Sequence, residues 1–190
     1  MRSKFWRFVL KLFGWKFVGG FRPEMAKCVM IEAPHTSVWD FIIGRIGVWI
    51  LGLNGRFLIK KEFFVFPISG LLKRMGGLPV DRGNRNNNIV NQVAKHFAAN
   101  DKFTIVITPE GTRRYAKNWK RGFYEIAMEA GVPIVLSFIN YGNKTCGVME
   151  TFYPTGNYAD DIVKIQEKYK DVEARYPEQF NMSKMYWDKN

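Results

Sequence analysis

One histidine and one aspartate stand five residues apart in the stretch EAPHTSVWDF, residues 32–41. A histidine beside a carboxylate can act as a general base, because the carboxylate keeps one imidazole nitrogen protonated and leaves the other free. Residues five apart on a regular helix point about 140° away from each other, so His35 and Asp40 can meet only if the chain turns between them. Ser37 is a good N-cap, and Asp40 stands three residues later, where a capping box has its acidic partner. The pattern therefore places His35 in a turn before a helix, within reach of Asp40.

The same residues also allow a purely structural interpretation. Asp40 can simply cap the helix, and His35 can be a polar loop residue. The other histidine, His96, lies in a polar helical pattern and is predicted to be on the surface.

Two other stretches carry groups that could bind an anion beside such a base. In GGLPVDRGNR, residues 76–85, Arg82 follows a short apolar run that is predicted to be a strand. It therefore stands at the carboxyl end of that strand, where α/β sheets bind ligands. In TPEGTRR, residues 108–114, Pro109 and Gly111 predict a tight turn in which Thr112 and Arg113 could present donors to an oxygen-rich anion. Glu110, between the proline and the glycine, could orient an arginine or accept a hydrogen bond from a substrate hydroxyl. Each stretch alone could equally be an ordinary loop with surface arginines. Together they suggest a phosphate site beside a general base.

Strands and helices are predicted to alternate along the chain. Short apolar runs bounded by Gly, Pro or charge predict strands at residues 27–33, 56–61, 78–81, 103–109 and 133–140. Helical patterns are found at residues 38–52, 63–75, 88–99, 122–130 and 159–175. This order predicts an α/β fold with one layered sheet flanked by helices. No repeat or linker divides the 190 residues, so we expect a single compact unit.

The charge of the chain restricts its partners. A formal charge of +12 favours nucleic acid, an anionic membrane surface or an acidic protein. Aromatic residues crowd toward the N-terminus, which favours the membrane. Cys28 and Cys146 are too few for a disulfide framework and do not have the spacing of a zinc site, so we expect a reducing compartment and no metal. The most apolar run, residues 41–53, is shorter than the ~20 residues of a membrane span and contains Arg45, so no transmembrane helix is expected.

The first residues of the chain have an amphipathic pattern. On a helix, Lys4, Arg7 and Lys11 share one stripe. The opposite face carries Phe5, Phe8, Val9, Leu12 and Phe13. The pattern predicts an amphipathic membrane-interface helix over residues 1–22, followed by the main domain at 23–190. Packing of this helix against the protein core is the alternative.

Five stretches, HTSVWD, KKEFFVFPISG, GGLPVDR, PEGTR and AGVPIV, resemble in this order the four motifs of the glycerophospholipid acyltransferase family, typified by 1-acylglycerol-3-phosphate acyltransferases. The motifs span residues 35–135. The resemblance implies a fold like that of glycerol-3-phosphate acyltransferases, with residues 23–190 as the acyltransferase domain. It also implies transfer of a fatty acyl group from a thioester of acyl carrier protein or coenzyme A to the hydroxyl of a lysophospholipid such as 1-acylglycerol-3-phosphate.

The resemblance further implies roles for individual residues. In the HxxxxD motif, His35 matches the family's base and Asp40 its orienting acid. The residues that match substrate-binding positions are Lys61, Arg82, Glu110, Gly111, Thr112 and Arg113. The residues that match the acyl-chain-binding motif are Val132, Pro133 and Ile134. The sequence departs from the family at Pro34, where an asparagine often stands, and at Pro79, where a large apolar residue is common.

This interpretation needs no cofactor beyond the thioester co-substrate. The expected partners are anionic membrane lipids, acyl carrier protein or a coenzyme A thioester, and the lysophospholipid acceptor, with no nucleic acid. The expected location is peripheral, at the cytoplasmic face of the cell membrane. Two alternatives remain: an acyltransferase for another acceptor, such as an amino-acid lysolipid or a lipid A precursor, and a non-catalytic basic module that binds membrane or nucleic acid.

Overall fold

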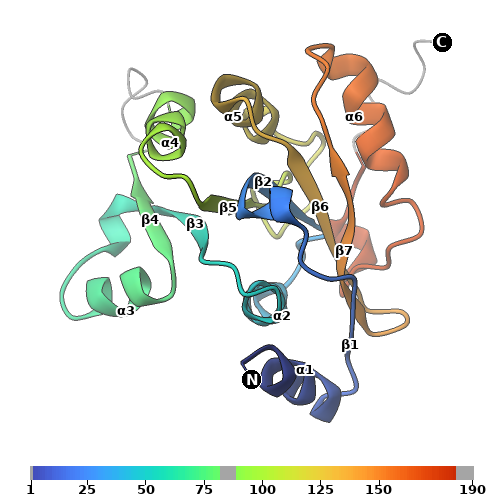
Figure 1. Ribbon diagram of the computed structural model, residues 1–190. Coiled ribbons are helices and arrows are strands. Elements are labelled where there is room, and N and C mark those ends of the chain that lie inside the picture. Colours follow the sequence, from blue (N-terminus) through green and yellow to red (C-terminus); the bar gives the residue numbers. More distant parts are fainter. Residues whose placement is uncertain (1, 82–88, 183–190) are drawn as a thin grey trace.

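The computed structural model describes residues 2–81 and 89–182, and within them the chain forms one seven-stranded sheet (Figure 1). The strands are β1 (Lys16–Val18), β2 (Lys27–Ala33), β3 (Gly55–Lys60), β4 (Gly77–Val80), β5 (Phe103–Ile107), β6 (Ile134–Asn140) and β7 (Thr145–Phe152). Their order across the sheet is β1-β7-β6-β2-β5-β3-β4. Neighbouring strands are parallel except for β6 and β7, which are antiparallel. The central strand β2 therefore has its carboxyl end in the middle of the sheet, the usual place for a site in such folds.

Helices cover both faces of this sheet. They are α1 (Arg2–Leu12), α2 (Val38–Ile50), α3 (Ile68–Arg74), α4 (Ile89–Ala98), α5 (Gly122–Ala130) and α6 (Tyr158–Glu167). Short 3₁₀ turns lie at Pro23–Ala26, Lys61–Phe63 and Pro177–Gln179. In Figure 1, α4 and α5 lie above the sheet and α1 and α2 lie below it, while α3 stands apart beside the edge strand β4.

The layers follow from the alternation of side chains along the central strand. On β2, Val29 and Ile31 point into the core that includes Phe123 of α5, whereas Cys28 and Met30 point into a second core between the sheet and α2. All four side chains are buried. A parallel strand covered on both faces is apolar along nearly its whole length, as the sequence of β2 is.

Most of the predicted elements are confirmed. The strand at 27–33 and the helix at 122–130 have the expected bounds, and Gly131 ends that helix in the left-handed conformation with φ +62°. The helix expected at 63–75 begins only at Ile68, because Pro67 has no N–H to donate and restricts the residue before it. Strands β1 and β7 were not predicted. Residue 88, where the helix predicted at 88–99 was expected to begin, lies outside the described residues.

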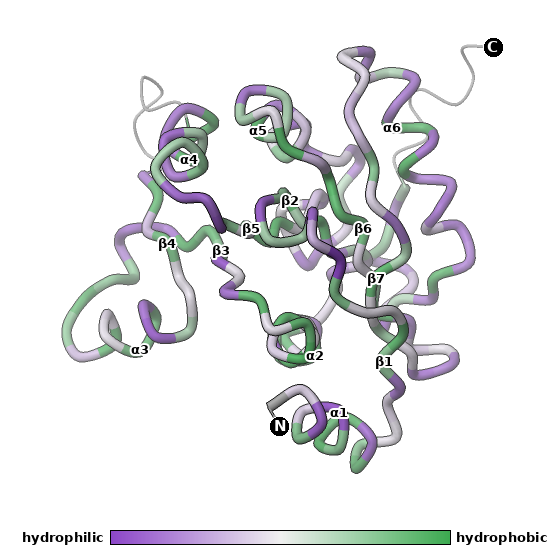
Figure 2. Tube along the Cα trace, in the orientation of Figure 1, coloured by the Kyte–Doolittle hydropathy of each residue, from purple (hydrophilic) through white to green (hydrophobic). Residues whose placement is uncertain are grey.

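The N-terminal helix is shorter than the expected 1–22 segment, since α1 ends at Leu12 and residues 16–18 join the sheet through β7. One stripe of α1 packs on the protein, with Leu10 buried and Trp6 stacked on Trp49 of α2 at 4.4 Å between ring centroids. Hydrophobic and hydrophilic residues alternate along it (Figure 2). The large apolar side chains that it leaves exposed are Phe5, Phe8 and Leu12.

No helix within the described residues is long and apolar enough to cross a membrane.

Candidate active site

The turn between β2 and α2 brings His35 and Asp40 together. Ser37 is the N-cap of α2, and Asp40 completes a capping box, as the sequence predicted. Asp40 Oδ2 accepts hydrogen bonds from the backbone N–H groups of Thr36 and Ser37, both at 2.7 Å. Outside the helix, His35 Nδ1 lies 3.5 Å from Asp40 Oδ2, an electrostatic contact longer than a good hydrogen bond. The imidazole therefore directs its other nitrogen, Nε2, away from the carboxylate.

Asp40 is fully buried, yet it stays ionised. Burial alone would raise its pKa, but contacts with His35, Tyr141 and the two backbone amides together lower the pKa below the usual value. The Tyr141 hydroxyl donates to Asp40 Oδ1 at 2.6 Å. Burial and the adjacent carboxylate raise the pKa of Tyr141, which keeps it a donor. Three hydrogen bonds from the protein thus replace water around the buried carboxylate, which can hold the imidazole in one orientation.

Tyr141 was not anticipated from the sequence. It follows β6 and lies 101 residues from Asp40 in the chain. Its backbone N–H donates to the carbonyl of Glu173 at 2.8 Å, and its ring packs edge-on against Trp15 at 4.9 Å between centroids. These contacts hold Tyr141 in position independently of its hydrogen bond to Asp40.

Glu110 supports the same turn from the other side. Its Oε1 accepts the backbone N–H of His35 at 3.0 Å, and only 3% of the residue is exposed. Burial raises the pKa of Glu110 to about 7, although hydrogen bonds from backbone amides oppose this shift. Glu110 does not line the cavity described below. Its geometry is that of a support for the His35 turn, whereas the resemblance implied contact with substrate.

A cavity of about 620 Å³ lies next to this turn. Its apolar walls come from α2, α3, α4, α5 and the strands between them, and include Phe41, Phe57, Ile59, Leu72, Val90, Ile107, Phe123 and Ile126. His35, Gly111, Arg113 and Lys120 line it as well. The cavity is of the size of small-molecule sites, and its polar groups include both the histidine and two cations.

The cations come from the loop after β5. Gly111 turns with φ +66°, and a Cβ there would lie 2.8 Å from the Lys120 side chain, which packs over the loop. Arg113 is exposed and lines the cavity, whereas Thr112 faces solvent and accepts the backbone N–H of Arg114 at 3.2 Å. Sequence reasoning missed Lys120, because it lies beyond the motif and approaches through this loop.

The other predicted substrate-binding residues are placed differently. Lys61 is exposed, pairs with the carboxylate of Asp81 and does not line the cavity. Arg82 lies outside the described residues. The residues predicted to contact the acyl chain are Val132, Pro133 and Ile134. Val132 and Ile134 are buried in the core with α5, and none of the three lines the cavity.

A carboxyl group that was not anticipated from the sequence, that of Glu32, also lines the cavity, three residues before His35. It is the one charged residue after the first position of β2, a signal visible in the sequence. Burial raises its pKa to about 8, with smaller contributions from Asp40 and Glu110. The carboxyl lies against Gly44 of α2, where a Cβ would be 1.9 Å from Glu32 Oε2. A side chain at position 44 would therefore displace the Glu32 carboxyl.

A segment near the C-terminus connects the two loops of the site. The Tyr176 backbone N–H donates to Thr36 Oγ1 at 3.2 Å, in the histidine turn. Asn181 Nδ2 donates to the carbonyls of Ala116 and Lys117 at 3.1 and 2.8 Å, and its own carbonyl accepts Trp119 Nε1 at 2.9 Å. The loop that carries Arg113 is thus held from the far end of the chain.

Among residues 2–81 and 89–182 there is no group of three or more His, Cys, Asp or Glu side chains placed to hold a metal ion.

The fold is an α/β sheet with flanking helices, and its His35–Asp40 pair lies beside an apolar cavity. Comparison with protein families matches residues 22–137 to the family described as Acyltransferase. This match covers more than half of the chain's 190 residues, so the chain belongs to the acyltransferase family. Comparison with curated proteins gives no significant match.

Among solved structures, the chain is similar to the 1-acyl-sn-glycerophosphate (LPA) acyltransferase PlsC from Thermotoga maritima. The TM-score is 0.59 at 18% sequence identity, and the alignment covers 88% of this chain and 75% of that one. At this identity the likeness concerns the fold. It confirms the predicted arrangement of a layered sheet with flanking helices and agrees with the predicted glycerophospholipid acyltransferase resemblance.

Proposed function

We propose that this acyltransferase moves a fatty acyl group from a thioester of acyl carrier protein or coenzyme A to the hydroxyl of a lysophospholipid such as 1-acylglycerol-3-phosphate. The observation that carries the proposal is the His35–Asp40 pair beside an apolar cavity of about 620 Å³ that is also lined by Arg113 and Lys120. A fatty chain fits the apolar walls, and an anionic headgroup fits the cations.

The proposed reaction uses His35 as general base. Asp40 faces Nδ1, so Nε2 accepts the proton of the acceptor hydroxyl as its oxygen attacks the thioester carbonyl. The tetrahedral intermediate then expels the thiolate, which takes the proton back from the imidazolium. An ester bond has formed, a thioester bond has broken, and His35 is neutral again. The ionised Asp40 stabilises the transient imidazolium, a role for which its lowered pKa suits it.

Anion binding falls to the cavity-lining cations in this proposal. Arg113 offers a planar guanidinium that can donate two parallel hydrogen bonds to a phosphate, and Lys120 adds a point charge. The basic surface, with a formal charge of +12, would also attract the acidic acyl carrier protein.

The proposed location is the cytoplasmic face of the cell membrane, with α1 lying in the interface. Its exposed Phe5, Phe8 and Leu12 beside Lys4 and Lys11 support this role. Because Leu10 and β1 are part of the fold, the clean test is Phe8→Ser rather than deletion. We expect weaker sedimentation with anionic vesicles and an unchanged Tm; unchanged sedimentation would remove α1 from the proposal.

The decisive experiment incubates the purified protein with acyl carrier protein and coenzyme A thioesters against a panel of lysolipids, with products identified by mass spectrometry. We expect diacyl product from 1-acylglycerol-3-phosphate. His35→Ala should abolish turnover while leaving the Tm within a few degrees of wild type. Product formed only from an amino-acid lysolipid or a lipid A precursor would assign another acceptor, and turnover by His35→Ala at the wild-type rate would refute the mechanism.

A further inference from the structure

The segment between β3 and β4 exposes five large apolar side chains within nine residues. These are Phe63, Val65, Phe66, Ile68 and Leu71, and Phe66 is 96% exposed. Contiguous apolar surface of this kind marks a site of interaction. We call residues 61–74 with these side chains the α3 surface.

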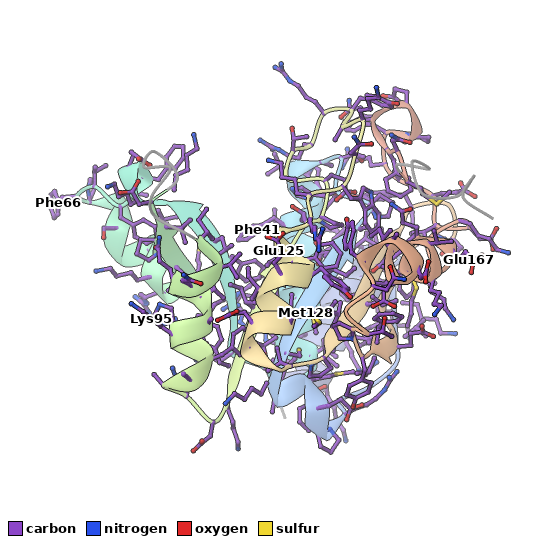
Figure 3. The ribbon with its side chains drawn as sticks, turned by 90° about the horizontal axis from the view of Figure 1, so that it is seen from above. Phe41, Phe66, Lys95, Glu125, Met128 and Glu167 are labelled. Carbon is purple, nitrogen blue, oxygen red and sulfur yellow. The ribbon has the colours of Figure 1, made fainter. Side chains whose placement is uncertain are left out.

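The α3 surface projects from the body of the molecule. In Figure 1, α3 lies beside the edge strand β4, apart from the helices that cover the sheet. Figure 3 places Phe66 at one extreme of the molecule and Glu167 of α6 at the other. A projecting apolar tip suits a deformable partner better than a rigid concave one.

The inner side of the same segment is a wall of the cavity. Leu72 of α3 and Met75 directly after it line the cavity, together with Ile59 of β3 and Gly77 of β4. One short stretch of chain therefore separates the cavity that lies beside His35 from the exposed apolar side chains outside.

Basic residues lie at both ends of the α3 surface. Lys60, Lys73 and Arg74 are exposed, and Lys61 pairs with Asp81. Glu62 is the one acidic residue between positions 60 and 75. Apolar side chains flanked by cations are the pattern of a segment that enters the interface of an anionic bilayer, because the cations are attracted to the anionic lipids.

We propose that the α3 surface inserts its apolar side chains into an anionic bilayer and brings the cavity wall against the acyl region of the lipid. A fatty chain then passes between bilayer and cavity without crossing water. This membrane contact is additional to the one proposed for α1. The contact itself stands on the surface chemistry, whereas the passage of a fatty chain rests on the proposed function.

The insertion is measured by a fluorophore at the tip. Phe66→Cys, labelled with an environment-sensitive dye, is mixed with phosphatidylglycerol vesicles, and Glu167→Cys is the matched control at the opposite end. The native thiols Cys28 and Cys146 are buried, so labelling is confined to the introduced cysteine. We expect a blue shift and increased emission at position 66 and none at position 167.

Affinity is measured with Phe66→Ser and, as the control, Tyr153→Ser, another exposed aromatic. We expect Phe66→Ser to bind these vesicles about tenfold more weakly, equivalent to about 1.4 kcal/mol. The Tm should not change, because the side chain is nearly free of contacts in the folded protein. Tyr153→Ser should bind like the wild type.

Three results would overturn the proposal. The dye at position 66 could remain in water on vesicle-bound protein, or Phe66→Ser could bind vesicles as tightly as wild type. The dye could also respond without lipid, to acidic acyl carrier protein or to a second copy of the chain, which would assign the surface to a protein partner. None of these readouts requires turnover. If the dye inserts but no lysolipid is acylated, the proposed function fails and the membrane contact stands.

Discussion

Replacing Tyr141 by phenylalanine removes one hydroxyl and leaves the ring in place, because the ring packs against Trp15 and the backbone is bonded to Glu173. Asp40 Oδ1 then loses its 2.6 Å donor, and the carboxylate is inaccessible to water in the folded protein. A hydrogen bond to a charged group is worth about 1.5–3 kcal/mol, and about 1.4 kcal/mol is a factor of ten. We expect kcat to fall by about 10- to 100-fold with little change in KM, since Tyr141 does not line the cavity.

Steady-state kinetics with the acceptor identified by the product panel measures this loss, and the exposed Tyr153→Phe is the matched control. A loss of stability alone does not lower kcat per folded molecule. The sharper test repeats Tyr141→Phe in an Asp40→Asn background, where the isosteric amide carries no charge to hold. There the further loss should be less than about threefold, because the two residues act through one interaction. Equal losses in both backgrounds, or wild-type kcat in Tyr141→Phe, would refute the reasoning.

Three further predictions concern the headgroup, pH and packing. Arg113→Gln should raise KM for the anionic acceptor about tenfold with kcat nearly unchanged, in steady-state assays against the exposed control Arg114→Gln. Burial raises the pKa of Glu32 to about 8 and of Glu110 to about 7, against about 4.3 in an unfolded chain, so the folded state binds more protons in between. The free energy of unfolding should therefore fall as pH rises from about 5 to 8, and denaturant titrations of Glu32→Gln should show a flatter decline. Gly44→Ala should lower the Tm because its Cβ would meet Glu32 Oε2 at 1.9 Å, but in a Glu32→Ala background it should stabilise α2 by about 0.5–1 kcal/mol.

The fold could be predicted wherever local pattern and burial agree. The strand β2 is an apolar run because both of its faces are covered, and α5 has a glycine stop, so their bounds follow from the sequence. Strand β7 is half polar and pairs with the edge strand β1, which is only three residues long, so neither has a clear strand pattern. Their pairing depends on tertiary contacts, which a local sequence pattern does not encode.

The sequence predicted the turn that carries His35 and Asp40, but not the residues from other elements that contact this site. The His35–Asp40 geometry follows from a capping box, which is written in consecutive residues. Tyr141 reaches Asp40 across 101 residues, and Lys120 approaches the cavity by packing over Gly111, so both depend on how separate elements meet. The four-motif resemblance identified Glu110 as important, but only the structure places its carboxylate on the backbone of the histidine turn.

The hydrogen bonds made by Tyr176 and Asn181 have a consequence for how the enzyme folds during its synthesis. The family-matched region, residues 22–137, contains the histidine turn and the loop of Arg113, yet Tyr141, Tyr176 and Asn181 all lie beyond it. During synthesis, therefore, a nascent chain that has emerged only through residue 137 carries every family motif but not the groups that align them. Contacts that span 65 to 140 residues form late in folding, so acyl-transfer competence should be the last property that this chain acquires.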